Sequence, residues 1–188
     1  LALDANTTGA TNVALGFCSL SANTTASNNV AIGSTTMRAN TTGCLNTGVG
    51  VGALLGNTTG CQNVAIGALA LDANTTGATN VALGFCALSA NTTASNNVAI
   101  GSTTMRANTT GCLNTGVGVG ALLGNTEGCQ NTAIGAVAME DNTTGDNNTA
   151  VGFQSLCSNT TGTPNTAFGT SALEKNTTAA DNVAIGAF

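Results

Sequence analysis

The chain has 188 residues, of which 42% are apolar and only 6% are charged, and its net charge is −5. This composition excludes the class of disordered proteins that combine low hydrophobicity with high charge. With no His, Trp or Tyr and only five Phe, the chain cannot build a core on aromatic residues. Three basic residues argue against nucleic-acid binding, which depends on neutralising phosphates. The longest nearly apolar run, residues 48–56, is too short and too rich in Gly to span a bilayer as a helix.

Asparagine recurs every 17 residues in two columns along the whole chain, and a Gly follows each Asn of the second column four residues later. A short fixed period is typical of a solenoid, in which each unit must stack on its neighbours to bury its apolar side. Seventeen residues are too few for a helical repeat, and Gly costs about 1 kcal/mol relative to Ala inside a helix. We therefore predict an all-β parallel β-solenoid, or β-roll, of about 11 coils with 17 residues per coil.

The two Asn columns are expected to form amide ladders, because a buried amide needs partners in the coils on both sides. We number each 17-residue unit from its first-column Asn, so the first column occupies position 1 of every unit and the second column occupies position 7. The predicted ladder residues are Asn6, Asn23, Asn40, Asn57, Asn74 and Asn91 in the first column and Asn12, Asn29, Asn46, Asn63, Asn80 and Asn97 in the second, and both columns continue at the same interval to Asn176 and Asn182.

Within each unit we predict two short strands. The first covers positions 7 to 10, as in residues 29–32, and ends at a Gly such as Gly33, which indicates a positive φ or a close backbone approach. The second covers positions 13 to 16 and centres on a Leu or Met that occurs in every unit. These residues are the predicted core: Leu20, Met37, Leu54, Leu71, Leu88, Met105 and Leu122.

Strand alternation leaves two interpretations of the small residue at position 9, such as Ala31. Either Val30 and Ile32 point into the coil and another chain packs against the Ala side, or the Ala points inward and the Val and Ile columns form an exposed apolar stripe. Both interpretations predict a partner that lies along the rod, and the simplest one is another copy of the chain.

A longer period is superposed on the short one. Residues 1–68 are repeated almost unchanged as residues 69–136, and the units in residues 137–188 diverge. We interpret residues 1–188 as a single continuous β-solenoid and as a segment of a longer array. Duplication of four units at a time suits a linear structure, because each coil contacts only its neighbours.

The strand motif Asn-Val-Ala-Ile-Gly resembles the head repeats of trimeric autotransporter adhesins, and residues 148–162 are also similar to repeats of phage and large-virus tail fibres. The resemblance covers every unit. It implies a left-handed parallel β-roll that assembles as a trimer. It implies no binding or catalytic residue, because the shared residues build the coil itself.

Seven Cys occupy three columns. The pairs Cys44–Cys61 and Cys112–Cys129 lie one coil apart in one column, which suits the Cα separation of a disulfide, and we predict that they form disulfides in an oxidising compartment. Buried free thiols are the alternative. The remaining cysteines, which are the predicted inter-chain thiols or free thiols, are Cys18, Cys86 and Cys157. We expect no metal site, since zinc sites use Cys and His together and the chain has no His.

The recurrent Asn-Thr-Thr is formally a glycosylation sequon, but a ladder Asn cannot also carry a glycan. Its Thr residues raise an ice-binding hypothesis, which is weak because adjacent Thr point to opposite sides. The few carboxylates, among them Glu140, Asp141 and Asp146, and the lack of His predict neither an enzyme nor a cofactor.

The preferred function is therefore a structural shaft of an extracellular filament, a surface fibre or a tail fibre, built by self-association at a cell or virion surface. The alternative is an adhesin or receptor-binding head for a host-surface or matrix ligand. The divergent residues 137–188 are where we would expect such a binding patch.

Overall fold

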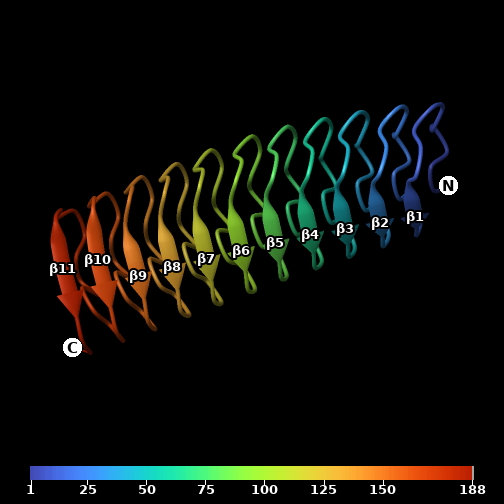
Figure 1. Cartoon of the computed structure of the whole chain (residues 1–188). Coiled ribbons are helices and arrows are strands. Elements are labelled where there is room, and N and C mark those ends of the chain that lie inside the picture. Colours follow the sequence, from blue (N-terminus) through green and yellow to red (C-terminus); the bar gives the residue numbers. More distant parts are fainter. Residues whose placement is uncertain (188) are drawn as a thin grey trace.

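The computed structural model describes residues 1–187, which wind into a single stack of coils (Figure 1). Each coil contributes one short strand, and the eleven strands form one parallel sheet in the order of the sequence. The strands are β1 (Val13–Leu15), β2 (Val30–Ile32), β3 (Thr47–Val49), β4 (Val64–Ile66), β5 (Val81–Leu83), β6 (Val98–Ile100), β7 (Thr115–Val117), β8 (Thr132–Ile134), β9 (Thr149–Val151), β10 (Asn165–Phe168) and β11 (Asn182–Ile185). Residues 1–187 contain no helix long and apolar enough to cross a membrane.

Successive coils lie in direct register. Val13 of β1 pairs with Val30 of β2, and Asn165 of β10 pairs with Asn182 of β11, so the offset is 17 residues at both ends of the sheet. Like residues therefore lie above like residues, which confirms the predicted parallel β-solenoid and its period. At a strand spacing of about 4.8 Å, eleven coils make a rod about 50 Å long.

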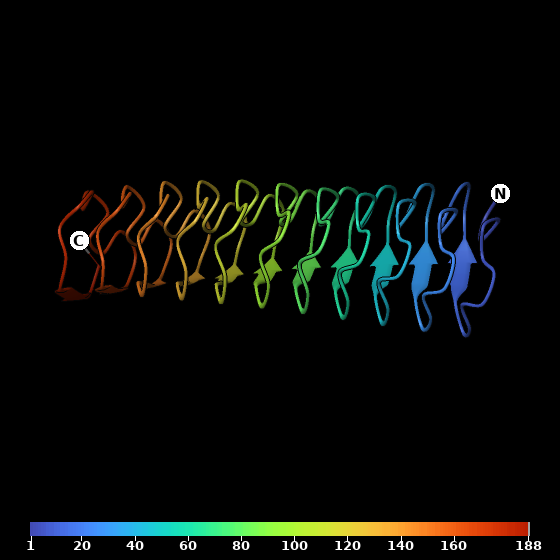
Figure 2. The ribbon, with the colours of Figure 1, turned by 90° about the horizontal axis from the view of Figure 1, so that it is seen from above.

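The predicted second strand of each coil is wrong. The residues after the first strand form a series of turns, which lie on the opposite side of the coil from the sheet (Figure 2). The cause is backbone conformation: Cys18 has φ of 51° and Leu20 has φ of 49°, and the core Leu or Met of every coil has a similar value. A residue in this left-handed region cannot continue an extended strand.

The core is a thin layer between the sheet and these turns. All the predicted core residues from Leu20 to Leu122 are fully buried, and the central strand residue, such as Ala31, is buried against them. Val30 is half-buried and Ile32 is 36% exposed. The small residue therefore points inward, as in the second of the two interpretations. A Cβ added to Gly48 would lie 2.8 Å from Cγ2 of Thr36, so this coil has no room even for Ala, whereas equivalent places in other coils hold a buried Ala such as Ala31.

The Gly that ends each strand has both properties expected of it. Gly33 has φ of 133°, and a Cβ at this residue would lie 2.6 Å from the carbonyl oxygen of Gly50 in the next coil. A side chain is therefore excluded twice, by backbone conformation and by the stacking distance. This Gly sets the tight corner at which the chain leaves the sheet.

Candidate functional site

The first Asn column forms an unbroken amide ladder. Nδ2 of each Asn donates to Oδ1 of the Asn in the preceding coil, at distances of 2.7–3.1 Å from Asn6 to Asn176. The same Nδ2 also donates to a carbonyl of its own turn, as Asn40 does to Gly43 at 2.9 Å. Every link runs in the same direction, and the residues of this column from Asn23 to Asn159 are fully buried. The predicted ladder is confirmed for this column.

The second Asn column couples the coils mainly through the backbone. Oδ1 of each Asn accepts the main-chain N–H of the next Asn in the column, at 2.8–3.1 Å. Its Nδ2 reaches forward to the turn of the next coil, as in the bond of Asn29 to the carbonyl of Gly43 at 2.9 Å. This carbonyl accepts from Asn40 as well, so both of its lone pairs are used. The two columns thus meet at one acceptor in each coil.

A third column stabilises the same turns and was missed by the sequence analysis. Ser27 Oγ accepts the backbone N–H of Ala10 at 2.9 Å, and Asp146 Oδ1 accepts that of Cys129 at 2.6 Å. Donor and acceptor both occupy position 5 of their units, and each acceptor lies one coil after its donor. The signal in the sequence is the composition of this column, in which eight of the eleven residues are Ser, Thr, Cys or Asp, all with an accepting atom, and the other three are Ala.

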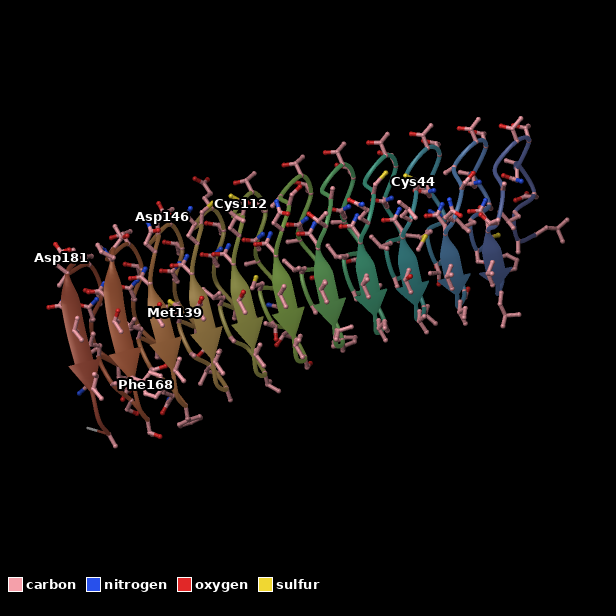
Figure 3. The ribbon with its side chains drawn as sticks, viewed as in Figure 1. Cys44, Cys112, Met139, Asp146, Phe168 and Asp181 are labelled. Carbon is pink, nitrogen blue, oxygen red and sulfur yellow. The ribbon has the colours of Figure 1, made fainter. Side chains whose placement is uncertain are left out.

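The predicted disulfide partners belong to this third column and lie side by side. The Sγ atoms of Cys44 and Cys61 are 3.1 Å apart, and those of Cys112 and Cys129 are 3.0 Å apart. Both pairs are thiols in this structure, along the loop edge of the rod where Figure 3 labels Cys44 and Cys112. Contact with Cys61 and burial raise the pKa of the Cys44 thiol. The pairs are thus positioned for oxidation, and the disulfides themselves remain a prediction.

The other three cysteines lie on two different surfaces. Cys18 and Cys86 are half-buried in the turn that follows the strand, directly after Phe17 and Phe85. Cys157 lies on the side opposite the sheet, and its Sγ is 3.8 Å from Oε2 of Glu140. Burial, together with the negative charge of Glu140, raises the pKa of Cys157 to about 11. Their role as inter-chain thiols remains a prediction.

The two Thr columns have different environments. The first Thr of each Asn-Thr-Thr is mostly half-buried, and its hydroxyl donates to a carbonyl of the next coil, as Thr41 does to Thr58 at 3.1 Å. The second Thr, such as Thr42, is exposed. One exposed Thr column at a turn is a narrow surface for ordering ice. Residues 1–187 bring together no group of three or more His, Cys, Asp or Glu side chains suited to a metal ion.

Exposed apolar side chains follow the strand side of the rod from coil to coil. We call the last residue of each strand the face column and the residue two places later the tip column. Ile66 of the face column is 43% exposed, and Phe85 of the tip column is 55% exposed. The face column consists of Leu15, Ile32, Val49, Ile66, Leu83, Ile100, Val117, Ile134, Val151, Phe168 and Ile185. Figure 3 labels Phe168 at the end of β10, on the edge away from Cys44.

A scan against models of protein families found no match, and searches of curated proteins and of solved structures found no significant relative of this chain.

Proposed function

We propose that this chain is a structural protein that forms the shaft of an extracellular filament, a surface fibre or a tail fibre. The observation that supports the proposal most strongly is the direct register of the coils. Hydrogen bonds of the ladders and of the sheet join residues about one coil apart, as in Asn57 to Asn40 at 2.8 Å, so each coil depends only on its neighbours. Such a structure can be lengthened without redesign. The proposal assigns the chain no reaction and no cofactor.

The test of this proposal is how length scales with sequence. Chains with one, two and three copies of the block 69–136 should form rods that lengthen by about 19 Å for each added block of four coils, at about 4.8 Å per coil. Electron microscopy or small-angle scattering measures this length. A length that does not increase with block number, or particles that are globular, would refute the shaft. A count of chains across the native fibre would test the trimer that the resemblance implies.

A second candidate function, an adhesin or receptor-binding head, is favoured by the distribution of charge. Five of the eight acidic residues lie in residues 137–188: Glu140, Asp141, Asp146, Glu174 and Asp181. The two nearly identical blocks offer a ligand almost the same surface repeatedly, whereas this region does not. If the chain is a head, removal of residues 137–188 should abolish attachment to its host surface or matrix ligand. A shaft that lacks these residues should remain a rod.

A further inference from the structure

All the charged side chains of the chain avoid one surface. The face column, the tip column and the first residues of the strands, such as Val64 and Thr115, contain no Asp, Glu, Lys or Arg. The eleven charged residues lie on the loops or on the side opposite the sheet. A surface that faces only water normally carries charge, and a continuous apolar strip along a whole molecule is a mark of an interaction site.

The tip column alternates between large and small residues from one coil to the next. In the first ten coils, large residues occupy the odd coils and the small residues Ser, Ala and Thr occupy the even coils; the eleventh coil has the small residue Ala187. From the first coil to the tenth, the column reads Phe17, Ser34, Val51, Ala68, Phe85, Ser102, Val119, Ala136, Phe153 and Thr170. The large members protrude into solvent: Phe17 is 73% exposed and Val119 is 59% exposed. The edge of the rod therefore carries knobs about 9.6 Å apart with gaps between them, since coils repeat at about 4.8 Å.

We infer that this surface binds a second copy of the chain in the antiparallel direction, so that the knobs of each copy enter the gaps of the other. With coil five of one copy opposite coil six of the other, every contact joins a large residue to a small one. The five kinds of contact are Phe17 with Thr170, Ser34 with Phe153, Val51 with Ala136, Ala68 with Val119, and Phe85 with Ser102. Parallel copies in register would instead place Phe against Phe and leave Ser opposite Ser. An antiparallel pair is closed by a two-fold axis, which a staggered parallel pair is not.

A second copy fits this surface better than an unrelated partner does. Only a surface with the same 17-residue pitch stays in step with the knobs over about 50 Å. The face and tip columns contain no charged residue that could recognise a charged partner. With a width of about 10 Å for three strand residues, the strip offers on the order of 500 Å² per copy, or about 1,000 Å² in total, which is close to the lower limit for a specific interface. The contact area grows with the number of coils, as a long array requires.

The inference depends on the proposed shaft, because it describes how shafts bundle. The experiment is sedimentation equilibrium of the full chain under reducing conditions, where a pair has twice the monomer mass of 18.1 kDa. Ser34→Phe with Ser102→Phe fills two gaps and should weaken pairing about tenfold or more, because each new side chain meets a knob. The fold should tolerate both changes, since Phe17, Phe85 and Phe153 occupy equivalent places. The matched control, Ser21→Phe with Ser89→Phe, adds the same atoms opposite the sheet and should leave pairing unchanged.

A compensating variant tests the antiparallel register. Adding Phe85→Ser and Phe153→Ser to the two gap-filling changes exchanges knob and gap at two kinds of contact, and pairing should recover. In a parallel arrangement staggered by one coil, Ser34→Phe would still face Val51, and pairing would not recover. The inference would be overturned if the chain stays monomeric at about 100 μM, or if the control variant pairs as weakly as the gap-filling variant. A monomer that still lengthens with block number would leave the shaft intact, so the two failures can be told apart.

Discussion

Replacing one ladder Asn in the middle of the rod tests whether the ladder stabilises the coil. Asn74 is fully buried and takes part in three hydrogen bonds. Its Nδ2 donates to Oδ1 of Asn57 at 2.8 Å and to the carbonyl of Gly77 at 3.0 Å, and its Oδ1 accepts Nδ2 of Asn91 at 2.9 Å. Asn74→Ala removes all three without touching the apolar core.

The expected cost follows from what each partner retains. Three net hydrogen bonds at about 1 kcal/mol each give about 3 kcal/mol. Gly77 O keeps the donor Asn63, and Asn91 keeps the acceptor Ala94, but Oδ1 of Asn57 loses its ladder donor and stays buried. That orphaned acceptor adds about 1 kcal/mol. We expect Asn74→Ala to lower the free energy of unfolding by about 3–4 kcal/mol.

Urea unfolding followed by far-UV circular dichroism measures this change. Thr76→Ala, an exposed substitution in the same turn, is the matched control and should cost less than about 0.5 kcal/mol. Asn74→Asp is a second probe: the buried carboxylate has no proton to donate, so this variant should be less stable at pH 7 than at pH 3. If Asn74→Ala costs no more than Thr76→Ala, the ladder does not hold the coils together.

Four further predictions concern other parts of the rod. Oxidation by an added oxidant should remove two hydrogens from the pair Cys44–Cys61 and raise the free energy of unfolding by about 3 kcal/mol, the gain expected for a closed loop of about one coil; peptide mapping that finds other pairings would contradict this. Oδ1 of Asp72 is buried without a hydrogen-bond partner among the described residues, and burial raises the pKa of this carboxyl. The neutral carboxyl of Asp72 stabilises the folded state below the ordinary carboxyl pKa, and this contribution is lost as the pH rises through the folded-state pKa. Asp72→Asn should therefore stabilise the chain at pH 7 and give no gain at pH 3, as measured by paired denaturation curves. Thr35 is β-branched with φ of 56°, so Thr35→Gly should stabilise by about 0.5–1 kcal/mol, and a measured loss of stability would disprove this. Because its pKa is about 11, Cys157 should react with iodoacetamide with a midpoint near pH 11, and a midpoint at pH 9 would be inconsistent with its environment.

The period predicted most of the architecture because a solenoid maps sequence interval directly onto spatial neighbourhood. Residues 17 apart in sequence, such as Asn23 and Asn40, are stacked, so the buried columns follow from the repeat alone. Two features could not be predicted in this way. The side chains of a strand alternate with period two, but this alternation does not determine which side faces the core, so the sequence leaves the orientation of Ala31 open and the structure shows it buried.

The second feature is the left-handed conformation of the core Leu and Met residues. Leu54 has φ of 53°, a conformation that ordinarily favours Gly or Asn, and nothing in its residue type indicates it. The apolar spacing around it therefore predicts a strand where the structure has a turn. The turns opposite the sheet are held by the stacking bonds of neighbouring coils, such as Leu54 N–H to the carbonyl of Ala70 at 3.0 Å, rather than by local preference. Tertiary context decides the backbone there.

The one-way direction of the first Asn column gives the rod a polarity that its repetitive surface conceals. Any cut through the array leaves amide hydrogens of an Asn on one side of the break and an amide oxygen on the other, because each Nδ2 points to the preceding coil. Two severed ends can therefore rejoin only head to tail, and two like ends would bring donor to donor or acceptor to acceptor.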